Sequence, residues 1–125
     1  MFQKDLLKGK RILVTGGGTG LGRSMTHRYL ELGANVVICG RREDVLKQTA
    51  EELAKETGGE IETVGCDVRI PDAVEAMMDR IWAKRPLDIL VNNAAGQILA
   101  QTHKMSSRAI DAVLGIVLHG SAYCT

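Results

Sequence analysis

The stretch VTGGGTGLGRS at residues 14–24 places five glycines within seven positions, directly after an apolar run. Glycine loses more conformational freedom on folding than any other residue, so this density predicts a backbone that something must approach closely. A glycine-rich turn between a strand and a helix is typical of a phosphate site. Backbone N–H groups and the positive end of the helix dipole there point at an anion.

Apolar runs on either side of this turn predict strands. Continuous apolar runs are typical of strands that are covered on both faces. The alternating run at 60–66 is instead typical of an edge strand with one exposed face. The four predicted strands lie at 11–15, 35–39, 60–66 and 87–93.

Apolar residues recur at helical spacing after each strand and predict four helices. These residues are Leu21, Met25 and Tyr29 in the first helix, Val45 or Leu46, Ala50 and Leu53 in the second, Val74, Met77 or Met78 and Ile81 in the third, and Ile110, Val113, Leu114, Val117 and Leu118 in the last. Gly33 is expected to end the first helix, Pro71 to open the third, and Ser106 or Ser107 to cap the last.

Strands that alternate with helices over short connections predict a parallel sheet with helices on both faces. We therefore expect an α/β fold, with a Rossmann-like doubly wound parallel sheet in a three-layer αβα arrangement. The expected order of the strands present is 3-2-1-4. Residues 1–125 then form one domain.

The composition gives no sign of a nucleic-acid partner. Sixteen basic and fifteen acidic residues leave a net charge of +1, and only 3% of residues are aromatic, which argues against a surface for base stacking. The three cysteines form no CxxC pair, so we expect reduced thiols and no metal site.

No apolar run approaches the roughly 20 residues that a membrane helix needs. The stretch MFQKDLLKGK at 1–10 lacks the apolar core and the cleavage site of a signal peptide. We therefore expect a soluble, cytoplasmic protein without membrane contact.

Two phosphate-binding motifs compete at the glycines. Residues 17–24 differ from the Walker A pattern by Arg23 in place of lysine, and an arginine does not replace that compact charge. A nucleotide hydrolase also needs an aspartate after a strand for magnesium, whereas the fourth predicted strand ends in asparagines. The pattern T-G-x-x-x-G-x-G, which begins at Thr15, fits better and predicts a dinucleotide site.

The end of the second predicted strand favours NADP(H) over NAD(H). A dinucleotide-binding unit places an acid here for the ribose of NAD, or an arginine for the 2′-phosphate of NADP. This chain has Gly40 followed by Arg41 and Arg42. Two solvated arginines are the alternative, although cations are disfavoured near the start of a helix.

Two further segments follow strands at the same edge of the predicted sheet. Asp67 and Val68 come after the third strand, and an Asx turn is the alternative explanation for this aspartate. The segment NNAAG at 92–96 ends the fourth strand at the switch point where ligands bind in such sheets. Asn93 could also satisfy buried backbone groups. The expected cofactor-binding residues are Gly16, Gly18, Thr19, Gly20, Leu21, Gly22, Arg41, Arg42, Asp67, Val68, Asn93, Ala94, Ala95 and Gly96.

The segments TGGGTGLG (15–22), GRR (40–42), NNAAG (92–96) and IVLHGSAY (116–123) resemble the N-terminal half of the short-chain dehydrogenase/reductase family. They look most like its 2,4-dienoyl-CoA reductase branch. The resemblance implies an NADPH-dependent oxidoreductase acting on unsaturated acyl-CoA thioesters, with the aspartate and its neighbour at the adenine ring.

The same resemblance implies a serine and a Tyr-x-x-x-Lys pair, which these 125 residues lack. Tyr29 is followed by Gly33 at the lysine position, and Tyr123 lies two residues from the end. We therefore expect a truncated chain that carries no catalytic residue and is inactive alone. A free-standing dinucleotide-binding or interaction module without catalysis is the alternative.

Many family members carry a relay asparagine on the last helix, where this sequence has His119 beside Gly120. His119 is a candidate relay because histidine titrates near neutral pH, although a solvated histidine is the more common case. His103 and Lys104 could meet an acidic CoA group, but a solvated loop at 100–107 is the simpler interpretation. A bare fourth strand and a bare last helix predict a homo-oligomer, with a domain-swapped completion or association with the missing half as the alternatives.

Overall fold

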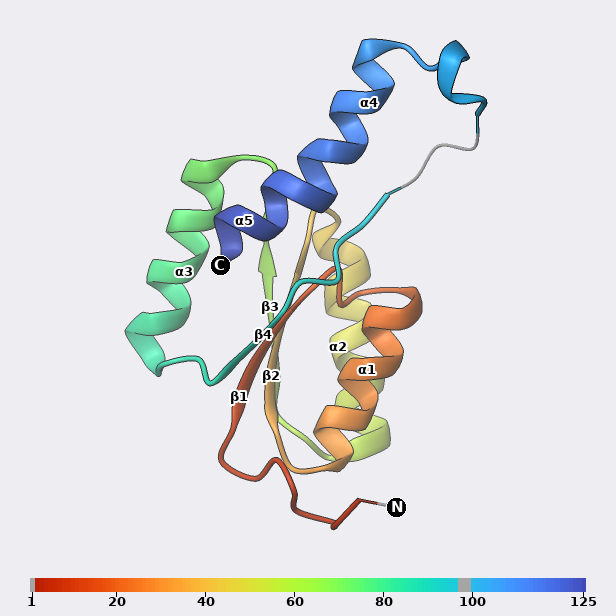
Figure 1. Ribbon diagram of the computed structural model, residues 1–125. Coiled ribbons are helices and arrows are strands. Elements are labelled where there is room, and N and C mark those ends of the chain that lie inside the picture. Colours follow the sequence, from red (N-terminus) through yellow and green to blue (C-terminus); the bar gives the residue numbers. More distant parts are fainter. Residues whose placement is uncertain (1, 97–99) are drawn as a thin grey trace.

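The computed structural model describes residues 2–96 and 100–125 (Figure 1). Strands and helices alternate along the chain from the N-terminus. Their bounds are β1 (Arg11–Thr15), α1 (Gly20–Glu31), β2 (Asn35–Gly40), α2 (Glu43–Thr57), β3 (Ile61–Gly65), α3 (Pro71–Lys84), β4 (Ile89–Val91), a 3₁₀ turn (Thr102–Lys104), α4 (Ser107–Leu114), a π-helical segment (Gly115–His119) and α5 (Gly120–Cys124).

The four strands form one parallel sheet in the order β3-β2-β1-β4. In the register, Thr15 at the end of β1 stands beside Cys39 of β2, and Gly40 stands beside Gly65 of β3. The carboxyl ends of the strands therefore meet at one edge. The predicted parallel sheet and its order 3-2-1-4 are confirmed.

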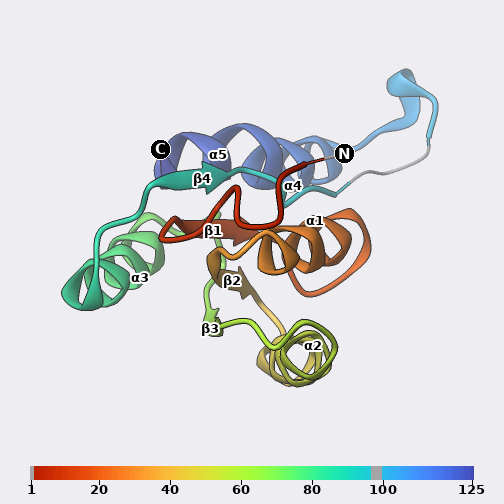
Figure 2. The same ribbon diagram turned by 90° about the horizontal axis from the view of Figure 1, so that it is seen from below.

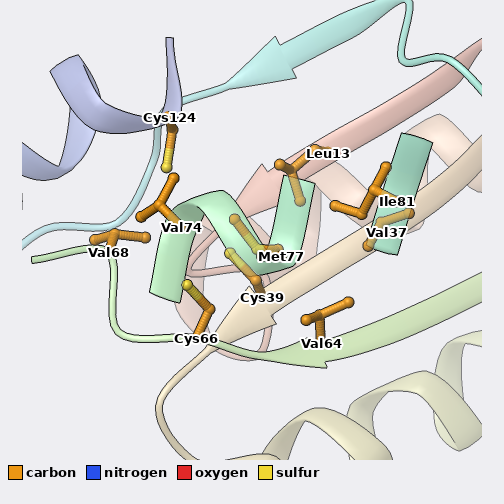
Figure 3. Close-up of a cluster of buried hydrophobic side chains, with 10 residues drawn as sticks. All are labelled: Leu13, Val37, Cys39, Val64, Cys66, Val68, Val74, Met77, Ile81 and Cys124. Atoms are coloured by element: carbon orange, nitrogen blue, oxygen red, sulfur yellow. The ribbon is translucent and has the colours of Figure 1, made fainter. Parts of the chain in front are cut away.

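Helices cover both faces of the sheet, as the predicted three-layer arrangement requires (Figure 2). Alternate residues of β1 point to opposite sides: Ile12 and Val14 pack in the core beneath α1 and α2, whereas Leu13 packs with α3 and α5. Figure 3 shows the second of these cores, in which Met77 and Ile81 of α3 face the sheet.

The buried face of α1 lies one residue further along than the apolar pattern indicates. Gly22, Thr26 and Leu30 are buried, whereas Leu21 is 69% exposed. Thr26 is accommodated because its hydroxyl donates to the Gly22 carbonyl at 2.8 Å. Small and hydroxyl-bearing residues therefore let this helix lie close to the sheet, which a search for apolar residues does not detect.

β4 is shorter than the predicted strand at 87–93, because it comprises only Ile89–Val91. The chain leaves the ladder at Asn93, whose N–H turns back to the Val91 carbonyl and to the Thr15 hydroxyl, both at 3.0 Å. At the other end, Asp88 N–H still donates to the Arg11 carbonyl at 2.9 Å.

Ser106 caps α4, as predicted, by accepting a hydrogen bond from Ala109 N–H at 3.1 Å. A π-helical segment, which the sequence did not predict, then joins α4 to α5. Gly120 N–H donates to the Gly115 carbonyl there, five residues back. In the described residues no helix is both long and apolar enough to span a membrane.

A buried arginine joins three elements at the end of the sheet where the strands begin. The Arg11 side chain donates to the Ile81 carbonyl at 2.7 Å, the Arg85 carbonyl at 2.6 Å and the Glu62 carboxylate at 3.0 Å. Lys84 gives this carboxylate a second partner at 3.0 Å. The charge of Arg11 is thus compensated by the C-terminal end of α3 and by β3.

Candidate functional site

A cleft of about 400 Å³ opens at the carboxyl ends of the strands. It is bounded by the glycine turn, the start of α2, the segments after β3 and β4, and the π-helical segment. The predicted residues in its lining are Gly16, Gly18, Thr19, Gly20, Leu21, Arg41, Arg42, Asp67, Val68, Asn93, Ala94 and Ala95. Gly22 and Gly96 were predicted as well but do not line it.

The N-terminus of α1 faces this cleft with its backbone donors available. The Thr19 side chain makes no capping hydrogen bond to any described residue, and the first turn of α1 holds no acid. Gly20 has a φ of +54°, and a Cβ there would meet no described atom within 4 Å. The N–H groups of this turn can therefore bind an anion that the cleft admits.

Gly22 acts from behind the cleft, by letting α1 approach the ends of β1 and β4. A Cβ at Gly22 would collide with the Gly16 carbonyl and the Asn93 side-chain amide. That amide donates to the Thr15 carbonyl at 3.2 Å and to the Gly16 carbonyl at 3.3 Å. Asn93 therefore satisfies backbone groups, as its alternative explanation proposed, while it also lines the cleft.

The Thr15 hydroxyl fixes the floor of the cleft. It accepts hydrogen bonds from the N–H groups of Asn93 at 3.0 Å and Ala94 at 2.9 Å. These contacts join the end of β1 to the segment after β4. The first residue of the T-G-x-x-x-G-x-G pattern thus positions backbone, and its own side chain is buried.

A second threonine holds the glycine turn from the other side. Thr49, buried on α2, donates its hydroxyl to the Gly18 carbonyl at 2.7 Å. This hydrogen bond fixes the glycine turn against α2. The apolar pattern predicts Ala50 on the buried face of this helix and gives no sign of Thr49.

Arg41 and Arg42 flank the cleft where β2 ends and α2 begins, as predicted, and both are exposed. Among the described residues, no carboxylate lies within 4.0 Å of either guanidinium. Gly40 occupies the place of an acid at the end of the strand. This part of the cleft therefore carries positive charge that no described carboxylate pairs with directly.

Asp67 lines the cleft and also forms the Asx turn that was its alternative explanation. Its Oδ1 accepts the backbone N–H of Arg69 at 3.0 Å, and the Arg69 guanidinium donates to both carboxylate oxygens. Hydrogen bonds from the Arg69 side chain hold the pKa of Asp67 below its usual range. Asp67 is therefore ionised and paired at neutral pH.

Two thiols form an inert part of the cleft wall. Burial raises the pKa of Cys39 to about 12 and that of Cys66 to about 11. At neutral pH both thiols are therefore protonated and unsuited to act as nucleophiles. With Cys124 they lie in the core on the α3 side of the sheet (Figure 3), and none forms a disulfide within the described chain.

The histidines identified from the sequence lie outside the cleft lining. The exposed His119 ring lies 6.1 Å from the Tyr123 ring, centroid to centroid. His103 and Lys104 lie in the exposed 3₁₀ turn before α4. Within residues 2–96 and 100–125, no group of three His, Cys, Asp or Glu side chains could hold a metal ion.

The cleft also contains residues that the sequence motifs do not assign to it. They are Cys39, Gly40, Val45, Leu46, Cys66 and Ile116. The apolar members could not be separated from ordinary core residues, because whether a core residue also faces the cleft depends on the packing of helix and sheet.

Residues 10–125 match the sequence profile of the short chain dehydrogenase family. The chain is 45% identical over 128 residues to a Caenorhabditis elegans protein named "Probable 2,4-dienoyl-CoA reductase 3", covering 100% of this chain and 41% of that protein. It is 44% identical over 124 residues to "Probable 2,4-dienoyl-CoA reductase decr-1.2" of the same organism, covering 97% and 40%.

A solved structure shares the fold along nearly the whole chain. Citronellol catabolism dehydrogenase (AtuB) of Pseudomonas aeruginosa PAO1 superposes with a TM-score of 0.91 at 36% identity, covering 99% of this chain and 51% of that one. The chain thus spans about two-fifths of these curated relatives and half of this structure.

The fold and its cleft define a Rossmann-type domain. The chain belongs to the short chain dehydrogenase family, a family of oxidoreductases that bind a nicotinamide dinucleotide. The predicted family is confirmed, and so is the predicted likeness to the 2,4-dienoyl-CoA reductases.

Proposed function

We propose that this chain forms the NADP(H)-binding half of an oxidoreductase that reduces unsaturated acyl-CoA thioesters. The observation that carries the proposal is the pair Arg41 and Arg42 beside the cleft, with Gly40 in place of an acid. A 2′-phosphate placed there would gain charge-assisted hydrogen bonds. NAD(H) offers these arginines no comparable partner.

The residues of the cleft fit the parts of a dinucleotide. The uncapped start of α1 would hold the pyrophosphate, and Asp67 and Val68 would lie beside the adenine. The floor at Asn93, Ala94 and Ala95 would take the nicotinamide ribose. When bound, the nicotinamide supplies or accepts a hydride, and this chain's part is to hold and orient it.

The substrate class is proposed from the relatives. The name of the first Caenorhabditis elegans relative describes it as producing a (3E)-enoyl-CoA. The present chain covers 41% of that protein, and residues 1–125 contain no Tyr-x-x-x-Lys pair. We therefore propose that proton transfer depends on residues outside this chain, and that the chain alone has no turnover.

Calorimetric titration of the chain with NADPH and NADH tests the cofactor proposal. We expect NADPH to bind at least about tenfold more tightly, since one charge-assisted hydrogen bond contributes about 1.5–3 kcal/mol. An R41A/R42A variant should bind both dinucleotides with similar affinity. R80A is the matched control, because Arg80 is exposed on α3 and outside the cleft lining.

Equal affinities for NADPH and NADH in the unmodified chain would contradict the proposed cofactor preference. Reduction of an enoyl-CoA by the pure chain would contradict the proposed dependence on further residues. Dinucleotide binding, together with no turnover in a longer chain that continues this sequence, would favour a binding module without catalysis.

A further inference from the structure

Asp67 is the acid among the described residues that line the cleft, and one arginine engages both of its carboxylate oxygens. Nε of Arg69 donates to Oδ1 at 2.9 Å and to Oδ2 at 3.3 Å, and Nη2 donates to Oδ2 at 2.7 Å. The Arg69 backbone N–H adds a bond to Oδ1 at 3.0 Å. Both carboxylate oxygens are thus satisfied from within the same short segment.

Arg41 lies within electrostatic reach of the same carboxylate. Its positive charge contributes to the lowered pKa of Asp67, after the larger contributions of Arg69. Arg41 nevertheless forms no ion pair with any described carboxylate. The side chain of Glu43, at the start of α2, lies over Gly65 of β3. Asp67 therefore has both Arg41 and Arg69 within electrostatic reach, and it is paired with Arg69.

Besides these hydrogen bonds, the Arg69 side chain lies near the start of the π-helical segment. A Cβ built on Gly115 would come within 3.4 Å of Arg69 Cδ. The side chain therefore lies between Asp67 and the start of the π-helical segment. The planar guanidinium presents its donors in a fixed arrangement, so it loses less entropy for each hydrogen bond that it forms with a carboxylate.

We propose that Arg69 is a positioning residue that sets the dinucleotide preference: by pairing with Asp67, it leaves Arg41 and Arg42 available for a 2′-phosphate. The inference rests on the proposed NADP(H) site and extends it to a residue outside the cleft lining. Without Arg69, the Asp67 carboxylate would attract Arg41 and repel the phosphate.

Two adenosine ligands test the proposed role of Arg69 at the adenosine end of the site alone. Adenosine 2′,5′-bisphosphate carries the 2′-phosphate and 5′-AMP does not, so the ratio of their affinities isolates the effect on that phosphate. We expect R69Q to lower this ratio about fivefold, the size expected for one uncompensated charge near the surface. R69K, which keeps the charge, should retain the ratio within about twofold.

A double variant separates charge from structure. D67N/R69Q removes the acid together with its partner, so it should restore the ratio that R69Q lowers. The single variant D67N, in which Arg69 keeps its charge, should keep or increase the ratio. Thermal unfolding of each variant reports its effect on stability separately.

An equal loss of affinity for both ligands in R69Q, or no recovery in D67N/R69Q, would overturn the inference while leaving the proposed cofactor intact. A fall of the ratio in D67N would do the same, even if R69Q failed to fold. If the unmodified chain did not prefer the bisphosphate, the proposed NADP(H) site would fail, and this inference with it.

Discussion

Thr49 connects two elements that each carry part of the candidate site. α2 begins beside Arg41 and Arg42, and the Thr49 hydroxyl of the same helix holds the Gly18 carbonyl of the glycine turn. The proposed 2′-phosphate end and the proposed pyrophosphate end of the cleft are thus joined by one buried hydrogen bond. A residue that contacts no ligand can therefore affect binding.

We predict that T49V weakens NADPH and NADH binding by the same factor. The change removes the hydrogen-bond donor from the buried Gly18 carbonyl, at a cost of about 1–3 kcal/mol. It disturbs the proposed site of the pyrophosphate, which both cofactors share. T49S keeps a hydroxyl and should bind nearly as the unmodified chain does. Calorimetric titration of each variant measures the two affinities.

T26V is the control for T49V. It makes the same change at a buried threonine, but the Thr26 hydroxyl bonds to Gly22 within α1. We expect T26V to alter dinucleotide affinity much less than T49V. Equal effects of the two variants, or a selective loss of NADPH in T49V, would refute the assigned role of Thr49.

At the level of single residues, the sequence located the parts of the site that chemistry makes distinctive. The glycine turn and the two arginines follow predicted strands, and the structure brings them to one cleft. Thr49 and Arg69 could not be recognised in the same way. A threonine on a helix and an arginine in a loop have many uses, and only tertiary packing shows which groups they contact.

At the level of elements, the contact between α1 and the sheet leaves no room for a side chain at Gly22. Gly22 is where the helix comes nearest to the turn behind β1 and to the segment after β4. A side chain at this position would meet the Gly16 carbonyl and the Asn93 amide, and neither group can easily move away. The turn therefore depends on a glycine that faces away from the cleft.

We predict that G22A lowers the free energy of unfolding by about 1–3 kcal/mol, which is typical of overpacking, and weakens dinucleotide binding as well. Urea denaturation measures the stability. G58A is the control: Gly58 ends α2 with a φ of +70°, and its Cβ would meet no described atom within 4 Å.

G58A should therefore cost about 1–2 kcal/mol of backbone strain and leave the affinity for dinucleotide unchanged. The affinity is thus the property that distinguishes the two variants. A G22A protein that binds NADPH as tightly as the unmodified chain would show that the close approach of α1 is dispensable.

The order and type of the strands followed from the sequence because buried parallel strands have a strong apolar signal. The bounds were less predictable. β4 ends early because Asn93 bonds to Thr15, and α1 buries Gly22 and Thr26, which an apolar pattern does not count. The π-helical segment has no local signal of its own, since its sequence is compatible with an ordinary helix.

The whole molecule leaves apolar surface uncovered on one side. Ile110, Leu114, Val117 and Leu118 are exposed along α4 and the π-helical segment, and Leu118 is 58% exposed. β4 pairs with β1 on one side and has no partner strand among the described residues on the other. Exposed apolar patches and free strand edges favour association.

We predict that the chain associates through the exposed apolar face of α4 and the π-helical segment, and that L118E shifts the equilibrium toward the monomer. A buried carboxylate without a partner would disfavour such a contact. Sedimentation velocity at several concentrations measures the shift. L6E is the control, because Leu6 is half exposed and lies in the N-terminal segment before β1.

The predicted homo-oligomer fails if the unmodified chain sediments as a monomer at every concentration. If it associates and L118E associates equally, another surface forms the contact. In that case the free edge of β4 becomes the surface to examine.

The buried Arg11 and the cleft lie at opposite ends of the same strands. β1 runs from Arg11 to Thr15, and four steps of about 3.3 Å separate the two by roughly 13 Å. Free-energy changes at sites this far apart, without shared partners, usually add. Stabilising changes around Arg11 can therefore be combined with changes of cofactor preference at the cleft, and each can be optimised independently.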